Sequence, residues 1–535
     1  MTGWDFASVF EAVAGVYPER TALVHGRRRL SWAQLDDRAS RLAAAFEAAG
    51  LAPGDVVAEY MRNGVEYIET FVAASKSALA SMNTNYRYVD DELVEIWADA
   101  GAKAVVFDTE FRDRVDRVRG RLPQVKLWLE VGADDAAPGN VAYEAALADH
   151  RPRPHGGGRG DALILIYTGG TTGRPKGVMW RQDDLLSLLN SQNSRPLPDR
   201  GDREAIQAHL AAHGREITSL VASPLMHGSG LFYSLSALAA AGTLVTLPGA
   251  RFDPEALFDV MEAERVKSLA IVGDAFARPM LKVLDANPGR WDLGSLRLVF
   301  SSGVMWSSET KEGLLRHLPK ARLLDGLGSS EASAVASTVS VSGDVADTAT
   351  FKLSDRAAVL LDDGTLAKPG DGKVGRLAVT GWLPVGYLKD PEKSAQVFIE
   401  AAGRRWSVPG DLAQLDADGR IRLLGRGSGV INTGGEKVFA EEVEEVLKKH
   451  PGVADAAVLG VSDERFGKKV VALVQPGYDA PSPDDLKAHV RSHLAGYKVP
   501  KHLAYVESLE RGANGKLDHR RLTEIAENKW GDGHE

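Results

Sequence analysis

A short segment rich in glycine and threonine constrains this chain more than any other feature. It reads Tyr167-Thr-Gly-Gly-Thr-Thr-Gly-Arg-Pro-Lys-Gly177. Glycine lets the backbone approach a ligand closely, and successive backbone amides of a turn form a site for anions. The threonine hydroxyls and Lys176 add hydrogen-bond donors and a positive charge. The segment therefore predicts a loop that binds polyphosphate.

The segment differs from the phosphate loop of the common nucleoside triphosphatases. That loop follows the pattern G-x-x-x-x-G-K-[ST] and opens a helix. Here Lys176 follows a proline, and Gly177-Val-Met-Trp180 has the composition of a strand. Residues 163–166 before the loop form a short apolar run of the same type. The glycines are therefore expected to join two strands.

The composition is that of a globular protein with more than one domain. The chain has 535 residues, a net charge of −9 and no cysteine. The acidic balance argues against general binding to nucleic acid or to a membrane surface. The lack of cysteine excludes disulfides, thiolate metal sites and cysteine nucleophiles, so any thiol chemistry must use a thiol brought by a substrate. The N-terminus lacks the pattern of a secretory signal, and the apolar stretch 230–247 is interrupted by serine and glycine. We therefore expect a cytoplasmic protein without a membrane span. A homodimer is compatible with this composition.

The glycine-rich segment resembles the signature loop of the adenylate-forming superfamily, which includes acyl-CoA synthetases, luciferases and peptide-synthetase adenylation domains. With Gly425-Arg-Gly-Ser428 and Ile431-Asn-Thr-Gly-Gly-Glu-Lys437, the chain is most similar to actinobacterial-type acyl-CoA synthetases, several of which act on steroid or other polycyclic acids. The resemblance implies an α/β (α+β multi-layer) fold. Residues 1–425 would form an AMP-binding, acyl-activating domain, residues 426–429 a hinge, and residues 430–535 a small mobile α+β domain.

Four further apolar runs each end in small or polar residues. The segments that follow them are Ser223-Pro-Leu-Met-His-Gly228, Gly273-Asp274, Ser301-Ser-Gly303 and Asp325-Gly-Leu-Gly-Ser-Ser-Glu331. In open α/β sheets ligands bind outside the carboxyl ends of the strands. These segments are therefore expected to share one site.

The last of these segments resembles the family motif whose glutamate helps to hold Mg²⁺ and whose neighbours line the adenine. Mg²⁺ takes hard oxygen ligands, usually one or two carboxylates with phosphate oxygens. The resemblance therefore implies that Glu331 and the Thr171 hydroxyl hold the metal. Leu327 stands where relatives have an adenine-stacking tyrosine, and Ser330 replaces a threonine.

Four features near the C-terminus complete the resemblance. Trp406-Ser-Val-Pro-Gly-Asp411 is similar to the motif whose aspartate binds the ribose, and Thr433-Gly-Gly-Glu-Lys437 to the glycine pair beside the pantetheine channel. Ser428 occupies the hinge position, where aspartate or lysine is usual. Lys516 matches the lysine that offsets repulsion between the acyl carboxylate and the α-phosphate of ATP.

The resemblance assigns four sets of residues. Lys516, Glu331 and Thr171 are the expected catalytic residues, with Glu331 and Thr171 also holding the metal. The expected ATP- and AMP-binding residues are Thr168, Gly169, Gly170, Thr171, Thr172, Gly173, Lys176, Ser302, Gly303, Val304, Asp325, Gly326, Leu327, Gly328, Ser329, Ser330, Asp411, Arg426 and Lys516. The acyl pocket comprises His227, Gly228, Ser229, Gly230, Asp274 and Gly303, and the CoA channel Gly434, Gly435, Glu436 and Lys437.

Two of the pocket assignments have an alternative. His227 either lines the acyl pocket or packs in the core. Asp274 either forms a pocket wall or caps a helix. The small residues around them would leave room for a bulky apolar acid.

The implied reaction is that of an ATP-dependent acid–CoA ligase, with ATP, Mg²⁺ and coenzyme A. A carboxylic acid and ATP give acyl-AMP and pyrophosphate, the small domain turns, and the CoA thiol takes the acyl group. The alternatives are an acyl-AMP ligase or amino-acid adenylation enzyme that loads a carrier protein, and a non-catalytic nucleotide-binding protein. The segment after His227 lacks the aspartate that holds an amino group in amino-acid enzymes. The presence of Lys516, Glu331 and Asp411 argues against a nucleotide-binding protein that has lost its catalytic activity.

Overall fold

The computed structural model describes residues 4–153, 159–168, 175–304, 306–426, 429–433, 436–463, 467–494, 496–512 and 515–531. The chain forms two compact units. The large unit lies within Met1–Ser333, Val339–Ala346 and Thr380–Phe398, and the small unit within Ala334–Thr338, Asp347–Val379 and Ile399–Glu535. The predicted division, with a hinge at residues 426–429, stays a prediction.

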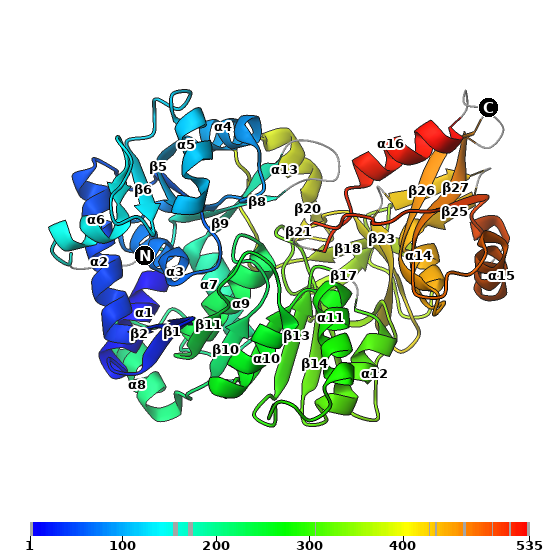
Figure 1. Ribbon diagram of the computed structural model, residues 1–535, viewed down its shortest axis with the longest axis horizontal. Helices are drawn as coiled ribbons and strands as arrows, with labels where there is room; N and C mark the ends of the chain where they lie inside the picture. The colour runs from blue at the N-terminus through cyan, green and yellow to red at the C-terminus, as the bar shows by residue number, and fades with distance from the viewer. Residues whose placement is uncertain are drawn as a thin grey trace. The chain divides into compact units, whose positions relative to one another are not determined.

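The first sheet of the large unit carries the four apolar runs. Within the large unit its strand order is β2-β1-β11-β10-β12-β13-β14, which is part of a 15-stranded sheet, and all neighbours in this part are parallel except β1 and β2. The strands are β1 (Thr21–His25), β2 (Arg28–Ser31), β10 (Thr218–Val221), β11 (Thr243–Thr246), β12 (Ser268–Ile271), β13 (Leu298–Ser302) and β14 (Arg322–Leu327). The crossover helices are α9 (Gly228–Ala239), α10 (Pro254–Ala263), α11 (Gly273–Ala286) and α12 (Ser308–His317) (Figure 1). Parallel strands joined by helices bury apolar residues on their faces, as Leu220, Leu269 and Val299 do here.

The second sheet of the large unit carries the glycine-rich segment. Its order is β19-β9-β8-β4-β3-β5-β6-β7. The strands are β3 (Val56–Tyr60), β4 (Ala80–Asn83), β5 (Ala102–Asp108), β6 (Leu127–Val131), β7 (Val141–Ala142), β8 (Leu163–Thr168), β9 (Lys176–Arg181) and β19 (Gly386–Tyr387), with helices α4 (Asp90–Ala100), α5 (Arg112–Arg119), α7 (Gln182–Ser191) and α13 (Pro391–Val397). β8 and β9 are antiparallel, and Thr168 pairs with Lys176. The prediction that the segment joins two strands is confirmed.

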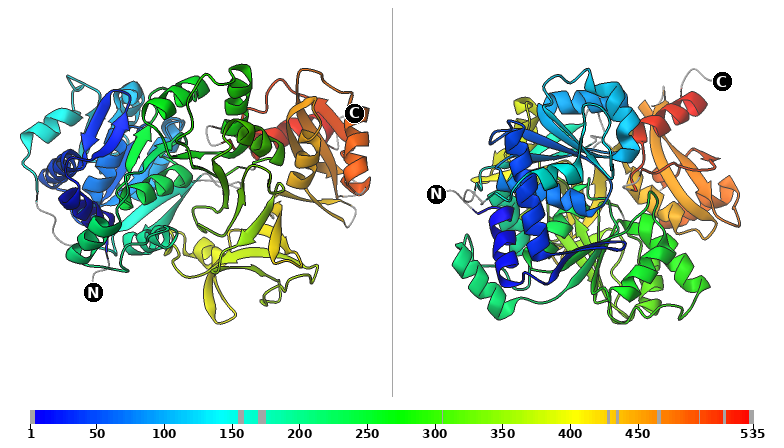
Figure 2. Two further views of the ribbon diagram at one scale, coloured as in Figure 1. Left: turned by 90° about the horizontal axis from the view of Figure 1, so that it is seen from below. Right: turned by 60° about the vertical axis from the view of Figure 1, so that its left-hand side comes forward.

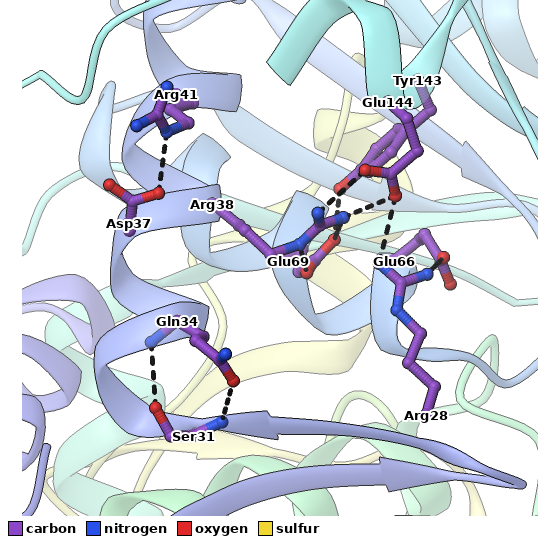
Figure 3. Close-up of polar contacts among 10 residues, drawn as sticks. All are labelled: Arg28, Ser31, Gln34, Asp37, Arg38, Arg41, Glu66, Glu69, Tyr143 and Glu144. Atoms are coloured by element: carbon purple, nitrogen blue, oxygen red, sulfur yellow. Dashed lines mark hydrogen bonds and ion pairs between the residues drawn. The ribbon is translucent and has the colours of Figure 1, made fainter. Parts of the chain in front are cut away.

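Four more helices belong to the large unit, and polar contacts join the second, third and fourth of them (Figure 3). They are α1 (Phe6–Val16), α2 (Trp32–Ala48), α3 (Val65–Lys76) and α6 (Tyr143–Asp149), and α8 (Arg203–His213) packs on α1. Ser31 and Gln34 form the predicted capping box, which satisfies amides at the start of α2. Arg38 binds the buried Glu69 of α3 at 2.5 Å and Glu144 of α6 at 2.7 Å. The guanidinium therefore neutralises a buried carboxylate and connects three helices.

The apolar stretch 230–247 forms the predicted helix and strand, α9 and β11. Leu231, Leu235 and Leu238 of this helix are buried inside the large unit. None of the helices in the described part of the chain is long and apolar enough to cross a membrane.

The first part of the small unit is an antiparallel sheet. Its order is β15-β16-β23-β22-β18-β21-β20, and β17 pairs with β18. The strands are β15 (Ala336–Ser340), β16 (Thr350–Leu353), β17 (Ala357–Leu360), β18 (Val374–Val379), β20 (Phe398–Ala401), β21 (Arg404–Ser407), β22 (Asp411–Leu415) and β23 (Arg420–Arg426). A buried cluster that includes Leu360, Ala378 and Trp406 forms its core.

The second part of the small unit is a three-stranded sheet with helices on both faces. It contains β26 (Val453–Asp463), β27 (Gly467–Pro476) and β28 (His502–Tyr505), helices α14 (Ala440–Lys448), α15 (Pro483–His493) and α16 (His519–Trp530), and the hairpin β24 (Val430–Thr433) and β25 (Glu436–Phe439). Successive residues of a strand point to opposite faces. Val458 accordingly packs in a core with α14 and α15, whereas Leu459 packs in a second core with α16. Both views of Figure 2 show α16, in red, against this sheet.

Candidate active site

The predicted strand ends share one edge of the first sheet. β13 and β14 run in register, so that Ser302 lies beside Gly326. Gly303 has φ +99°, in the left-handed region that favours glycine, and it turns the chain away at the end of β13. The Ser301 hydroxyl accepts a hydrogen bond of 2.8 Å from the Gly273 amide, which joins the ends of β13 and β12. The strands and their common edge are thus confirmed.

Tyr167 anchors the strand that precedes the glycine-rich segment. Its ring is buried, and its hydroxyl donates a 2.5 Å hydrogen bond to Asp99. A side chain at Gly177 would place its Cβ 2.7 Å from the Tyr167 ring, so β9 needs glycine there. Gly169, Gly170, Thr171, Thr172 and Gly173 lie outside the described residues.

Lys176 lies at the start of β9 in contact with two residues of a distant segment. Its Nζ is 2.6 Å from Asp390 Oδ2 and 5.7 Å from the centre of the Tyr387 ring. Pairing of β19 with β9 brings Tyr387 opposite Val178. The hydrogen bond and charge of Lys176 hold the pKa of the Asp390 carboxyl below its ordinary value.

Glu331 lies at the other end of the same tyrosine. The Tyr387 hydroxyl donates a 2.8 Å hydrogen bond to Glu331 Oε1. The buried indole of Trp180 donates a 2.9 Å bond to the Ser330 carbonyl. Residues 330–331 are therefore held by β9 and β19, and the Tyr387 side chain lies between the loop lysine and the glutamate expected to hold Mg²⁺.

Sequence reasoning missed Tyr387 and Asp390. Asp390 caps α13 by accepting a 2.9 Å bond from the Lys393 amide, and Pro391 follows it. An aspartate before proline is a recognisable helix start. That local signal identifies the cap, but it contains no information about the pairing with Lys176, 214 residues away.

Asp325 forms an ion pair inside the large unit. Its carboxylate is buried and lies 3.1 Å from Nζ of Lys311, a fully buried residue of α12. Burial raises the pKa of Asp325 to about 6, although the charge of Lys311 opposes this rise. The Asp325 side chain is thus used in an internal ion pair, and the place of this residue in the nucleotide site stays a prediction. Its neighbour Gly326 packs against Phe300.

Four of the residues expected around the acid, His227 to Gly230, lie at the start of α9. His227 is the N-cap residue of this helix. A Cβ at Gly228 would lie 3.5 Å from Ser330 Oγ, so an expected acyl residue neighbours an expected nucleotide residue. A Cβ at Gly230 would lie 2.4 Å from the Pro224 carbonyl, so this glycine is required by the packing of the turn.

Asp274 makes two contacts within the large unit. Its Oδ1 accepts a 3.2 Å bond from the Ser307 amide, and its Oδ2 pairs with Arg278 at 3.1 Å. Both contacts hold the first turn of α11, where the residue lies. The N-cap residue of α11 is Val272, and the pocket role of Asp274 stays a prediction.

Asp411 begins β22 in the small unit. It pairs across the ladder with Arg426, the last residue of β23. Gly410 before it has φ +106°, which favours glycine. Ser428, Gly434 and Gly435, and the side chains of Arg426, Glu436 and Lys437, lie outside the described residues.

Lys516 is exposed on an anchored turn of the small unit. The Gly512 amide donates a 2.8 Å bond to the Lys516 carbonyl. Arg511 donates a 2.9 Å bond to the Gly515 carbonyl and forms an ion pair with Asp455. The backbone beside Lys516 is therefore fixed while its side chain faces solvent.

Comparison with known proteins decides the family. Residues 10–385 match the family model described as AMP-binding enzyme, and residues 442–516 match the AMP-binding enzyme C-terminal domain. The chain belongs to the AMP-binding enzyme family. The predicted adenylate-forming resemblance is thereby confirmed.

Relatives of this AMP-binding enzyme extend over nearly its whole length. The chain is 38% identical to the 3-oxocholest-4-en-26-oate–CoA ligase of Rhodococcus rhodochrous, over 96% of this chain and 95% of the relative. It is 36% identical to the medium/long-chain-fatty-acid–CoA/3-oxocholest-4-en-26-oate–CoA ligase of Mycolicibacterium smegmatis, over 99% and 97%.

Solved structures confirm the α/β fold of this AMP-binding enzyme. The anthranilate CoA ligase AuaEII, in complex with anthranoyl-AMP, superposes with a TM-score of 0.84 at 21% identity, covering 99% of this chain and 98% of that one. ATP-bound MatB from Rhodopseudomonas palustris gives a TM-score of 0.79 at 25% identity, covering 98% and 99%.

The side chains around Tyr387 fit the magnesium and nucleotide expected of an AMP-binding enzyme. Mg²⁺ prefers hard oxygen ligands, and the Glu331 carboxylate offers one beside the Tyr387 hydroxyl. Lys176 offers a cation to the phosphates that share such an ion.

Proposed function

We propose that this AMP-binding enzyme is an ATP-dependent acid–CoA ligase that activates a bulky apolar acid, either steroid-like and polycyclic or a fatty acid. The observation that carries the proposal is that Tyr387 contacts both Lys176 and Glu331. This arrangement offers a cation for phosphates and a carboxylate for Mg²⁺ near Gly228, the start of the expected acid pocket. The relatives named above support the class of acid.

In the first step a carboxylate oxygen of the acid attacks the α-phosphorus of ATP, and the bond to pyrophosphate breaks. Lys176 and the glycine-rich segment hold the β- and γ-phosphates, and Asp411 binds the ribose. Lys516 offsets the repulsion between the two anions. Bound Mg²⁺, held by Glu331 and Thr171, would neutralise charge on the phosphates.

In the second step the CoA thiol loses its proton and attacks the acyl carbonyl carbon, and AMP leaves. We propose that residues 430–535 turn about residues 426–429, with Ser428 as the pivot, and withdraw Lys516. Gly434, Gly435, Glu436 and Lys437 would then line the path of the pantetheine arm. Domain motion is a common way to separate two half-reactions. The cytoplasmic location and the homodimer expected from the sequence remain predictions.

Pyrophosphate exchange tests the proposal. The full-length protein is assayed with Mg²⁺ and ATP against steroid-like, fatty, aryl and short acids, and product formation is then followed with and without CoA. Exchange with the bulky acids and thioester formed only with CoA are expected. Preference for acetate or benzoate would refute the class of acid. Exchange without thioester formation would favour a carrier-protein ligase, and no exchange with any acid would favour a non-catalytic nucleotide-binding protein.

A further inference from the structure

Asn83 is a buried polar residue at the carboxyl end of β4. Its side-chain amide pairs with the backbone of Tyr167 at two points. Oδ1 accepts a 2.6 Å bond from the Tyr167 amide, and Nδ2 donates a 3.1 Å bond to the Tyr167 carbonyl. β4 and β8 are already paired through Met82 and Leu165. The Asn83 side chain therefore extends this strand pairing to the residue that leads into the phosphate loop.

The same amide also holds a third segment. Nδ2 of Asn83 donates a 2.5 Å bond to the Met226 carbonyl. Met226 precedes His227, the N-cap of α9, where the expected acid pocket begins. A side-chain amide has two N–H donors, and here both are directed to carbonyls. One residue thus connects the root of the phosphate loop with the root of the acid pocket.

Asn63 provides a natural comparison because it holds only the second of these segments. Its Nδ2 donates a 3.0 Å bond to the Ser223 carbonyl, and its Oδ1 accepts a 2.7 Å bond from the Leu225 amide. Both ends of the Asn63 amide are used on the turn before α9. The chain therefore contains two asparagines that bind this turn, of which Asn83 also binds β8.

We propose that Asn83 is a positioning residue that holds Tyr167, which leads into the phosphate loop, in a fixed relation to the turn before α9, where the expected acid pocket begins. This inference rests on the proposed ligase function. For reaction, the carboxylate oxygen must lie about 3–3.5 Å from the α-phosphorus and in line with the bond that breaks. In the proposed function, a different segment holds each of the two substrates. Asn83 fixes both segments through bonds to main-chain atoms. Its loss leaves the buried amide and carbonyl of Tyr167 without these partners, so the end of β8 must shift.

Three variants separate this role from ordinary core packing. Asn83→Ala removes all three bonds. Asn83→Asp keeps the shape of the side chain, but an oxygen replaces the NH2 group. This carboxylate oxygen faces the carbonyl oxygens of Tyr167 and Met226 and repels them. Asn63→Ala is the matched control, since it releases the turn before α9 and leaves the pairing with Tyr167 intact. Thermal unfolding of each variant reports whether the fold is kept. If Asn83→Ala is unfolded, the measurements are made on Asn83→Asp, whose side chain has the same shape as that of the wild type.

The first measurement is the affinity for ATP with Mg²⁺ by titration calorimetry, without any acid. Both Asn83 variants are expected to bind ATP about tenfold more weakly, whereas Asn63→Ala keeps the wild-type affinity. In pyrophosphate exchange, Asn83 variants should raise KM for both ATP and acid and lower kcat, whereas Asn63→Ala should raise KM for the acid alone.

Two results would overturn the inference. One is wild-type ATP affinity in folded Asn83 variants, and the other is the same kinetic profile for Asn83 and Asn63 variants. Failure of the proposed function is distinguishable from either, because the wild-type protein would then bind ATP but catalyse no exchange with any acid. That outcome overturns the coupling to an acid site, even where the variants weaken ATP binding.

Discussion

Arg511 and Asp455 form a two-point ion pair at the start of the turn that carries Lys516. The distances from Nε to Oδ2 and from Nη2 to Oδ1 are 2.5 and 2.8 Å. Although burial alone would raise the pKa of Asp455, the hydrogen bonds and charge of Arg511 hold it below the ordinary value. Arg511 also binds the Gly515 carbonyl, so one guanidinium fixes the turn to β26. Arg511 thus holds the backbone carbonyl next to Lys516, the proposed catalytic lysine.

Lys516→Ala should abolish pyrophosphate exchange but largely preserve thioester formation from synthetic acyl-AMP and CoA. Only the first half-reaction brings two anions together, and it needs the cation between them. The two half-reactions are assayed separately. Equal loss in both would contradict the role given to Lys516.

Arg511→Ala should lower pyrophosphate exchange by roughly one to two orders of magnitude, because a loosened turn misplaces Lys516. Thioester formation from acyl-AMP should change little. Arg520→Ala, at an exposed position on α16, is the matched control and should behave like the wild type. An exchange rate unaffected by Arg511→Ala would show that the anchor is dispensable.

Tyr387→Phe should raise the Mg²⁺ concentration needed for half-maximal exchange by about tenfold, since a hydrogen bond to a carboxylate contributes about 1.5–3 kcal/mol. The phenylalanine ring still lies against Lys176, so KM for ATP at saturating Mg²⁺ should change less. Tyr233→Phe, which removes a buried hydroxyl bonded to Ser268, serves as control. A magnesium titration that matches the wild type would contradict the link to Glu331.

Lys311→Met should destabilise the large unit by about 3–5 kcal/mol at neutral pH, because it leaves Asp325 buried without its partner. The folded-state pKa of Asp325 is about 6, above its ordinary value of 3.8. Protonation is therefore favoured in the folded state, and removal of Lys311 raises the pKa of Asp325 further, so the destabilisation should shrink as the pH falls from 8 to 5. Denaturant unfolding at pH 5 and pH 8 measures this. The double variant Lys311→Met, Asp325→Asn should recover most of the stability that Lys311→Met loses at pH 8. If the double variant is no more stable than Lys311→Met, the ion pair is not the cause of the loss.

Glu444→Gln should stabilise α14 above pH 7. Burial raises the pKa of Glu444 to about 7 from its ordinary 4.5, although Lys448 opposes the rise. A raised carboxyl pKa gives stability that is complete below pH 4.5 and is lost as the pH rises through 7, by roughly 3 kcal/mol. Glutamine removes this loss and still accepts the bond from the Val458 amide. Hydrogen exchange of α14 amides between pH 5 and 8 tests the effect, with Glu524→Gln as the exposed control.

Local patterns explain what the sequence predicted well. Ser31 and Gln34 cap α2 through their own neighbours, and the strands on either side of the glycine-rich segment follow from short apolar runs. The ends of β10, β12, β13 and β14 share an edge because parallel strands joined by helices must align in this way. These features depend on residues close together in the chain or on general rules of topology.

Such rules cannot predict contacts between segments that are far apart in the sequence. Tyr387 meets Glu331 across 56 positions, and only the placement of β19 beside β9 brings it there. Asp325 occupies a motif position that relatives use beside the nucleotide, but the sequence gives no sign that Lys311 is buried opposite it. The hydrogen bonds of Asn83 likewise depend on packing between β4, β8 and the turn before α9.

The two cores on opposite faces of β26 and β27 have a consequence for how this protein can evolve. α14 and α15 cover one face and α16 the other, so this sheet needs no outside partner to bury its apolar side chains. Substitutions in the proposed acid pocket around α9 would touch neither core. A lineage could therefore exchange one acid for another by drift in the large unit, while inheriting the segment that carries Lys516 unchanged.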